Sequence, residues 1–429
     1  MAKTALVDSN YLQQLLHSGV FKQMEYDVPY ALVWADGRYQ AERIKTAPES
    51  STPAKPLRLP AEIDDLVMVY LVGDLATLRS AALTCRAWLA AARQHIFRYV
   101  QIPDDRWCGP LLRAIRSSPV IASCIRTLQI GNPNLMSVKL SSCHSDYAIA
   151  FLSGLADSPD ALPSLCCLEL YFVAEVWDPK IIGKVARFTS VVSLSLIKCG
   201  LSADEICALL SAFPGLRHLK VEQCANVFDG RLKKTSLPRL HDPALLSLCI
   251  DDRGSMKDGL NTVLDYLLTS RSKRTLSSVK LVLGEDGVAA AGYFLAHMGD
   301  VLQHMEIGFW IVVDTVQQLI TKALRSIDLR YNTNLRQLTL YDPTSPVTQH
   351  FLLDIRSRKI QQVTLRCSPK DVNVQTCASV VSSIFCAPNL QSLDRVRVLF
   401  DGEVEPKARA AFEGLEKGIL EFGQWDSRA

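Results

Sequence analysis

The sequence predicts an α/β protein in which a small three-helix module precedes a long solenoid of strand-turn-helix repeats. Two observations predict the solenoid: a six-residue phrase recurs along most of the chain, and helical patterns separate its copies. An ordered run of helix signals predicts the module. We therefore expect an N-terminal extension and linker at 1–56, the module at 57–102, the solenoid at 103–400 and a tail at 401–429.

Composition narrows the class of protein. The 429 residues are 48% hydrophobic and 21% charged, which is typical of a folded chain, and a net charge of +3 gives no sign of nucleic-acid binding. Polar residues interrupt the first twenty positions, and no segment is apolar enough to span a bilayer, so we expect neither secretion nor a membrane. Thirteen cysteines without a C-x-x-C pair favour reduced thiols, as in the cytoplasm or nucleus.

The extension carries few signals. Residues Tyr11 to Leu16 favour a short helix, and the segment from Ala47 to Pro56 is rich in Pro and Ser, as a flexible linker is.

Three helices are expected in the module. Pro60 is suited to the first helical position, and the apolar stripe behind it contains Ile63, Leu66, Val67, Tyr70 and Leu71. Gly73 ends this helix and Asp74 can cap the next. The second apolar face contains Leu75, Leu78, Ala81 and Ala82, and the third, after a break near Thr84 and Cys85, contains Trp88, Leu89, Ala92 and Ile96. So small a module has too little interior to be stable by itself, which favours docking.

The solenoid is predicted from the recurring phrase, which is apolar at its first, fourth and sixth positions. Its copies begin 25 to 40 residues apart, at 97, 125, 165, 191, 216, 245, 276, 302, 335 and 360, with LQSLDR at 390 as a degraded last copy. The fourth and sixth positions should point together into the core at strand period. A similar phrase, LRSIDL at 324, is expected to end a helix.

Two copies extend to the pattern L-x-x-L-x-L-x-x-N/C-x-L and place Cys199 and Cys224 at its N/C position. The array therefore resembles leucine-rich repeats, with parallel strands on the concave face and helices outside. Both cysteines are then expected to be core residues that bond neighbouring backbone rather than metal ligands. Ser202 is a suitable cap for the helix that follows Cys199.

The module carries a second resemblance. Leu59-Pro60 opens its first helix, and Leu78, Leu83, Cys85 and Trp88 are spaced as L-x4-L-x-C-x2-W. This order of residues, which covers about a tenth of the chain, resembles the F-box. The whole chain resembles F-box proteins of fungal type with a leucine-rich-repeat-like array.

In that family the F-box binds a Skp-type adaptor, which joins a cullin-based ubiquitin ligase, and the rest of the chain selects the protein substrate. The resemblance implies a substrate-recognition subunit of an SCF-type ligase. It nominates a set of residues that contact the adaptor or hold that face in shape: Leu59, Pro60, Ile63, Leu66, Leu78, Leu83, Cys85 and Trp88. The small residues from Ala87 to Ala92 depart from the family and leave an alternative open, a repeat scaffold that is not coupled to a ligase.

Candidate substrate-binding residues occupy the third and fifth positions of the phrase and the position that follows it, because these side chains should face the concave surface. Those selected are Glu169, His218, Lys220, Glu222, Lys280, His304, Glu306, Tyr341 and Arg366. Such a mixed-charge surface with few aromatic residues suits a protein partner better than stacked nucleotide bases.

No catalytic motif was found. The chain lacks G-x-S-x-G, G-x-x-x-x-G-K-[ST] and H-E-x-x-H, and its cysteines and histidines form no ligand pattern. We therefore expect no catalytic residue, no metal and no cofactor in this chain. Basic runs near 231, 271 and 356 are interpreted mainly as helix ends, where the helix dipole stabilises cations.

Overall fold

The structure is a computed structural model that describes residues 30–35, 38–43, 61–132, 146–158, 161–173, 177–224, 239–253, 256, 259–310, 316–341, 346–367, 374–390, 392–401 and 420–425. The chain divides into two units, 1–60 and 61–429. In the first, strands β1 (Tyr30–Ala35) and β2 (Arg38–Arg43) pair antiparallel, with Trp34 opposite Tyr39. The expected helix at Tyr11 to Leu16 lies outside the described residues.

The second unit opens with the three expected helices, α2 (Ala61–Tyr70), α3 (Leu75–Ala82) and α4 (Arg86–Ile96). Asp74 caps α3 as predicted, since its carboxylate accepts hydrogen bonds from the backbone N–H groups of Ala76 and Thr77. Cys85 caps α4 through a weak bond from the Trp88 N–H to its sulfur. The helices enclose a small core made of Met68, Leu78, Ala81, Ala91 and Ala92.

The apolar stripe predicted on α2 lies largely on its exposed side. Ile63, Leu66 and Tyr70 are exposed, and Met68, which does not belong to the stripe, is fully buried. Apolar residues cover more than one side of α2, so periodicity alone did not distinguish the covered face from the uncovered one.

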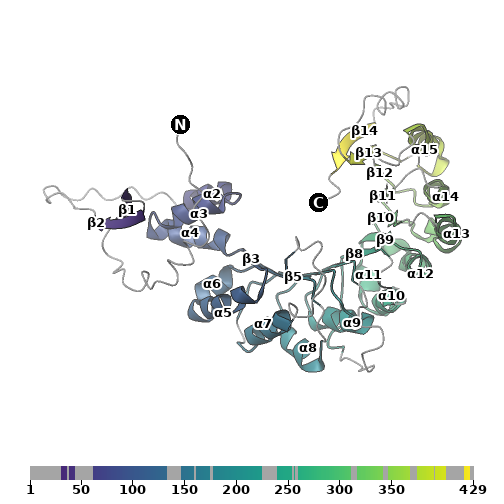
Figure 1. The fold of residues 1–429 in the computed structure, drawn as a ribbon. Helices are drawn as coiled ribbons and strands as arrows, with labels where there is room; N and C mark the ends of the chain where they lie inside the picture. Colours follow the sequence, from purple (N-terminus) through teal and green to yellow (C-terminus); the bar gives the residue numbers. More distant parts are fainter. Residues whose placement is uncertain are drawn as a thin grey trace. The chain divides into compact units, whose positions relative to one another are not determined.

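The rest of the unit is a parallel sheet with helices along its outer side (Figure 1). Each strand pairs with the strands that precede and follow it in the sequence, from β3 to β14. The strands are β3 (Tyr99–Ile102), β4 (Thr127–Ile130), β5 (Cys167–Tyr171), β6 (Ser193–Ile197), β7 (His218–Glu222), β8 (Ser247–Asp252), β9 (Ser278–Leu283), β10 (His304–Phe309), β11 (Gln337–Tyr341), β12 (Gln362–Cys367), β13 (Arg395–Asp401) and β14 (Leu420–Trp425).

The α-helices between the strands form the outer layer. They are α5 (Cys108–Ser117), α6 (Pro119–Cys124), α7 (Asp146–Ala156), α8 (Pro179–Val185), α9 (Ala203–Ala212), α10 (Gly259–Thr269), α11 (Ser272–Thr275), α12 (Val288–Met298), α13 (Val316–Ser326), α14 (Pro346–Asp354) and α15 (Val374–Cys386). The solenoid joins the module through α6, which packs against α4. As expected, the phrase at 324 ends a helix, because α13 stops at Ser326.

The repeat phrase sets the register of the sheet. Its fourth positions align from strand to strand, as Leu168, Leu194 and Leu219 do, and its sixth positions align beside them. Both rows are buried in one continuous core, as the strand period predicts. The third and fifth positions lie on the other face of the sheet.

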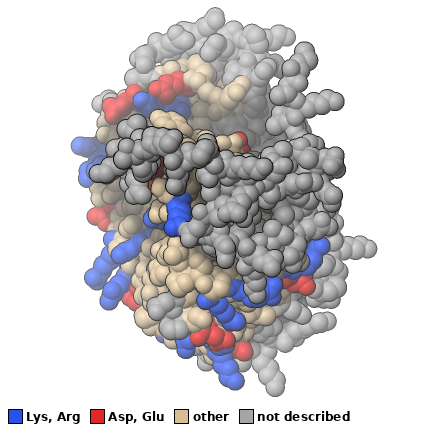
Figure 2. Space-filling model, turned by 90° about the vertical axis from the view of Figure 1, so that its left-hand side faces the viewer, with Lys and Arg blue, Asp and Glu red and all other residues tan. Residues whose placement is uncertain are grey.

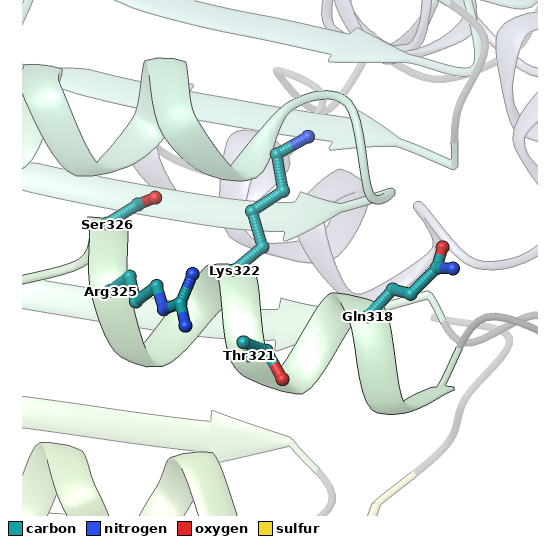
Figure 3. A pocket seen from close by; sticks show the side chains of 5 residues that line it. All are labelled: Gln318, Thr321, Lys322, Arg325 and Ser326. Carbon is teal, nitrogen blue, oxygen red and sulfur yellow. The ribbon is translucent and has the colours of Figure 1, made fainter.

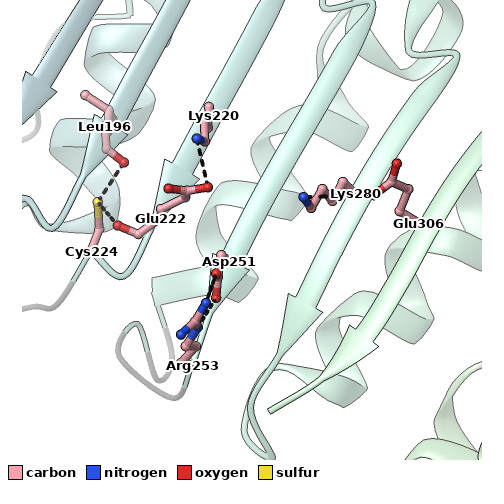
Figure 4. A network of polar contacts seen from close by, with 8 residues as sticks. All are labelled: Leu196, Lys220, Glu222, Cys224, Asp251, Arg253, Lys280 and Glu306. Atoms are coloured by element: carbon pink, nitrogen blue, oxygen red, sulfur yellow. Dashed lines mark hydrogen bonds and ion pairs between the residues drawn. The ribbon is translucent and has the colours of Figure 1, made fainter. Parts of the chain in front are cut away.

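Cys199 and Cys224 occupy the predicted inward position. The Cys199 thiol bonds the Leu170 carbonyl at 3.3 Å, and the Cys224 thiol bonds the Leu196 carbonyl at 3.4 Å (Figure 4). Each cysteine thus satisfies a backbone group of the preceding repeat, which confirms its structural interpretation. Ser202 caps α9 as predicted and forms a capping box with Glu205.

The end of the solenoid differs from the prediction. Leu390 belongs to a short 3-10 helix, η6 (Pro388–Leu390), and the last phrase begins instead at Leu393, so that Val396 aligns with Val363. A further strand, β14, lies beyond residue 400, in the segment expected to be a tail. The array also begins inside the expected module, because β3 is already part of the sheet. The copy of the phrase at 97 already indicated this strand, whereas weak apolar patterning hid the boundary at the other end.

Candidate functional site

The first candidate site is an apolar surface on α2, α3 and the turns that follow them. It comprises large hydrophobic side chains that are mostly exposed, and we call it the helical surface: Ile63, Leu66, Val69, Tyr70, Val72, Leu75 and Leu83. Tyr70 and Leu83 are the most exposed, at 87% and 69%. Large exposed apolar side chains concentrated in one short module indicate an interaction site, because exposing them to water is unfavourable.

The residues nominated for adaptor binding separate into groups. Ile63, Leu66 and Leu83 belong to the helical surface, whereas Leu78 is fully buried and holds α3 in place. Cys85 is exposed at the start of α4. Leu59 and Pro60 lie outside the described residues.

Trp88 lies on the core side of the module and stabilises the helices that carry the helical surface. Its ring is half-buried against the small core, and its indole N–H donates to the Asp64 carboxylate at 2.7 Å, which ties α4 to α2. Ala91 and Ala92 pack inside the same core. The small residues of α4 therefore let the helices approach closely, and they do not diminish the apolar surface, which α2 and α3 supply.

Sequence reasoning missed part of this surface. Val69, Tyr70, Val72 and Leu75 were not nominated. The available signal was the apolar content of α2, which exceeds what one inward stripe requires.

The second candidate site is the strand face opposite the helices, which we call the inner face. All nine residues nominated for substrate binding lie on strands β5, β7, β9, β10, β11 and β12, at the positions that alternate with the buried rows. Glu169 lies apart near Cys167, and His218 is exposed at the start of β7. Lys220 and Glu222 form an ion pair of 2.9 Å on one strand (Figure 4).

Four of the nominated residues come together on β9 to β12. Glu306 lies 3.9 Å from the Lys280 ammonium and 3.8 Å from the Arg366 guanidinium. Tyr341 donates its hydroxyl proton to Glu306 at 3.1 Å and accepts a 2.7 Å hydrogen bond from Arg366. Both cations also lie near the Tyr341 ring. His304 is the first residue of β10 and lies two positions before Glu306, on the same side of the strand.

The environment of Tyr341 keeps its hydroxyl protonated. Burial, followed by the negative charge of Glu306, raises the pKa of Tyr341 above its ordinary value. The phenol therefore remains a hydrogen-bond donor to Glu306 at neutral pH. Gly308 makes room for the Tyr341 side chain, since a Cβ at this position would lie 3.0 Å from three of its carbons, two of them in the ring.

Several charged residues of the inner face were not nominated. Asp251 binds Arg253 at 2.9 Å, and the Arg253 guanidinium lies 4.7 Å from the centre of the Trp310 ring. On the last strands, Glu421 binds Arg395 at 2.9 Å and Arg397 at 3.4 Å. The last group was missed because the last repeat was placed three residues too early.

The outer surface offers a different kind of feature. A shallow hollow on α13 is lined by Gln318, Thr321, Lys322, Arg325 and Ser326, whose side chains spread along one helix without converging (Figure 3). Basic and acidic side chains are also interspersed on the face of the molecule in Figure 2. The described residues contain no group of three or more His, Cys, Asp or Glu that is placed to hold a metal ion.

Comparisons with known proteins assign the chain to no family. No family model matches the chain, and no curated protein matches it. Within the described part of the chain, no helix has the length and apolar character needed to cross a bilayer.

Proposed function

We propose that this protein is the substrate-recognition subunit of an SCF-type ubiquitin ligase, which binds a Skp-type adaptor through α2–α4 and a protein substrate through a leucine-rich-repeat-like solenoid. The observation that carries the proposal is the helical surface. Large apolar side chains are exposed on the same short module whose sequence resembles the F-box.

The energetics favour a protein partner at this surface. Covering apolar area contributes about 25 cal/mol per Å², so each half-exposed aliphatic side chain that is covered contributes about 1 kcal/mol. The seven side chains of the helical surface lie within 21 residues of the chain, on α2, on α3 and in the turns that follow them, and α2 and α3 both pack against α4. Asp64 and Trp88 hold α2 against α4, which prepares this face before binding.

In this role the chain performs no bond chemistry. The adaptor and cullin would bring a ubiquitin-conjugating enzyme close to the substrate that the solenoid holds. The rate increase then comes from the raised local concentration of the substrate near an active site in another subunit. The wide inner face, with its mixed charges and few aromatic residues, suits a protein surface.

The test is capture of a purified Skp-type adaptor by the full chain and by two matched variants. Leu83 and Leu353 are equally exposed, at 69%, but Leu83 follows α3 and Leu353 lies on α14. We expect Leu83→Arg to abolish capture, because it would bury an unpaired charge, and Leu353→Arg to leave capture unchanged.

Failure of the wild-type chain to capture the adaptor would refute the proposal and leave a repeat scaffold that is not coupled to a ligase. Equal loss of capture in both variants would show that the helical surface is not the binding site.

A further inference from the structure

The residues that immediately precede the strands form a row along the edge at which the strands begin, which we call the entry row. The row runs from Arg98, before β3, to Asp394, before β13. Along it, the backbone N–H of each member donates to the carbonyl of the member before it, over 2.7 to 3.1 Å. These hydrogen bonds fix the order of the side chains, with one strand spacing of about 4.8 Å between neighbours.

Most charges of the entry row are positive. Its charged members are all exposed, and they are Arg98, Arg126, Arg217, Arg336 and Asp394. Arg98, Arg126 and Arg336 form no side-chain hydrogen bond or ion pair within the part of the chain that the structure describes. Their charges are therefore available to an anion outside the protein.

Capping of helix ends does not explain these three arginines. A base that caps a helix bonds its last carbonyls, as Arg187 bonds the Ala156 carbonyl at the end of α7, over 2.8 Å. No such bond is formed by the side chains of Arg98, Arg126 and Arg336 within the described residues. The entry row thus contains cationic groups that the fold itself does not require.

Further bases lie next to the row. Lys273 and Arg274 are exposed shortly before β9, and Arg358 and Lys359 shortly before β12. A hollow of about 320 Å³ opens at this edge, and it is lined by Arg336, Arg358, Lys359, Gln361, Ser392 and Asp394. Positive charge therefore extends from the row onto the turns beside it.

Apolar side chains alternate with the bases in the middle of the row. Val192 and Leu246 precede β6 and β8, on either side of Arg217, and they are 38% and 40% exposed. Apolar side chains gain nothing against a phosphate backbone, and the row contains no aromatic ring on which bases could stack. Bases interspersed with apolar side chains are typical of surfaces that bind anionic membranes.

The length of the row also fits an extended surface. Eight strand spacings separate Arg98 from Arg336, which gives about 38 Å along the edge. A single small anion cannot contact both ends of such a row, whereas a bilayer presents many headgroups in one plane.

We propose that the entry row and the bases beside it bind the surface of a membrane that contains anionic phospholipids. The arginines contact lipid phosphates, and Val192 and Leu246 enter the interfacial layer. Peripheral contact of this kind needs no spanning segment. The inference goes beyond the proposed function, because it concerns neither the helical surface nor the inner face, and it adds a place at which the chain is held.

The experiment measures partition of the full chain onto sedimented vesicles at low ionic strength. One set of vesicles is phosphatidylcholine alone, and the other contains about one third phosphatidylserine. We expect partition onto the phosphatidylserine vesicles to be at least about tenfold stronger, because the bases are attracted to the negative surface potential. Added salt should weaken it, since salt screens exposed charges.

Two pairs of variants locate the contact. Arg126→Gln, Arg336→Gln should weaken partition onto phosphatidylserine vesicles by about tenfold. The matched control is Arg113→Gln, Lys180→Gln, which removes the same charge from exposed positions of α5 and α8 and should change partition by less than about twofold. Leu246→Ser should weaken partition by about threefold, and Leu353→Ser, on α14, should leave it unchanged.

Equal partition onto the two sets of vesicles, or an equal loss in the α5 and α8 control, would overturn the inference. So would full partition of Leu246→Ser, which would reduce the contact to charge alone. A double-stranded DNA that binds the wild-type chain more tightly than the vesicles do, and that Arg126→Gln, Arg336→Gln releases, would replace the membrane with a nucleic acid. Adaptor capture by the arginine variant should equal that of the wild-type chain, so the two proposals fail separately.

Discussion

At the scale of single residues, Trp88 shows how one side chain supports a docking face without belonging to it. Its ring packs behind α2 and α3, and its N–H bonds Asp64. Spacing had identified Trp88 as important but not its hydrogen bond, because Asp64 is 24 positions away and reaches it only after α2 and α4 have packed.

The Trp88 hydrogen bond can be tested by substitution. We expect Trp88→Phe to lower the free energy of local unfolding of α2–α4 by about 1–2 kcal/mol, since it removes a bond to a carboxylate, and Trp88→Ala to lower it by about 3 kcal/mol. Native-state hydrogen exchange of the amides in α2–α4 measures both. Trp107→Phe, at an exposed tryptophan, is the control, and an effect equal to that of Trp88→Phe would contradict this explanation.

Tyr266 provides a pH test at the same scale. Burial raises the pKa of Tyr266 to about 12, from 10.0 in the unfolded chain, so the folded chain holds this proton more tightly. The stabilising contribution is complete below pH 10 and is lost as the pH rises through 12. Relative to Tyr266→Phe, the wild-type chain should lose about 2 kcal/mol of stability between these values.

Thermal unfolding of both chains from pH 9 to 12 measures this difference. The exposed Tyr331 offers the matched control, and Tyr331→Phe should follow the wild-type curve. Parallel curves for Tyr266→Phe and wild type would show that Tyr266 does not titrate as described.

At the scale of elements, repeated apolar positions were sufficient to predict the strands. Ten phrases predicted β3 to β12, because the buried rows are the strongest signal in such a sheet. Periodicity did not predict the structure correctly where the apolar residues fit more than one arrangement. On α2 it did not show which side is covered, and near residue 390 two overlapping phrases differed by three positions.

Packing between outer helices depends on a glycine. A Cβ on Gly292 of α12 would fall on the carbonyl oxygen of Ser326 at the end of α13. We expect Gly292→Ala to force the two helices apart and to destabilise the solenoid by about 1–3 kcal/mol, as overpacking does.

Gly183 on α8 is the matched site, because a Cβ there meets no atom within 4 Å. Gly183→Ala should stabilise its helix by about 0.5–1 kcal/mol, since alanine is the better helix former. Thermal unfolding compares the two variants, and shifts of Tm in the same direction would refute the packing argument.

At the scale of the whole molecule, the sequence predicted an α/β architecture of module and parallel sheet, and the structure has both. The inner face could be predicted because alternate positions of a strand share one side of a sheet, and three nominated residues, Lys280, Tyr341 and Arg366, do meet around Glu306. The ion pairs at Glu421 could not, because β14 follows a long interval without a recognisable phrase.

The central claim is that α2 and α3 form the surface that binds a Skp-type adaptor. Hydrogen exchange of the full chain, with and without the purified adaptor, tests it most directly. We predict slower exchange confined to residues 61–85, with the amides of β9 to β14 unchanged. Protection on the strands instead of the helices, or no protection by the adaptor at all, would contradict the claim.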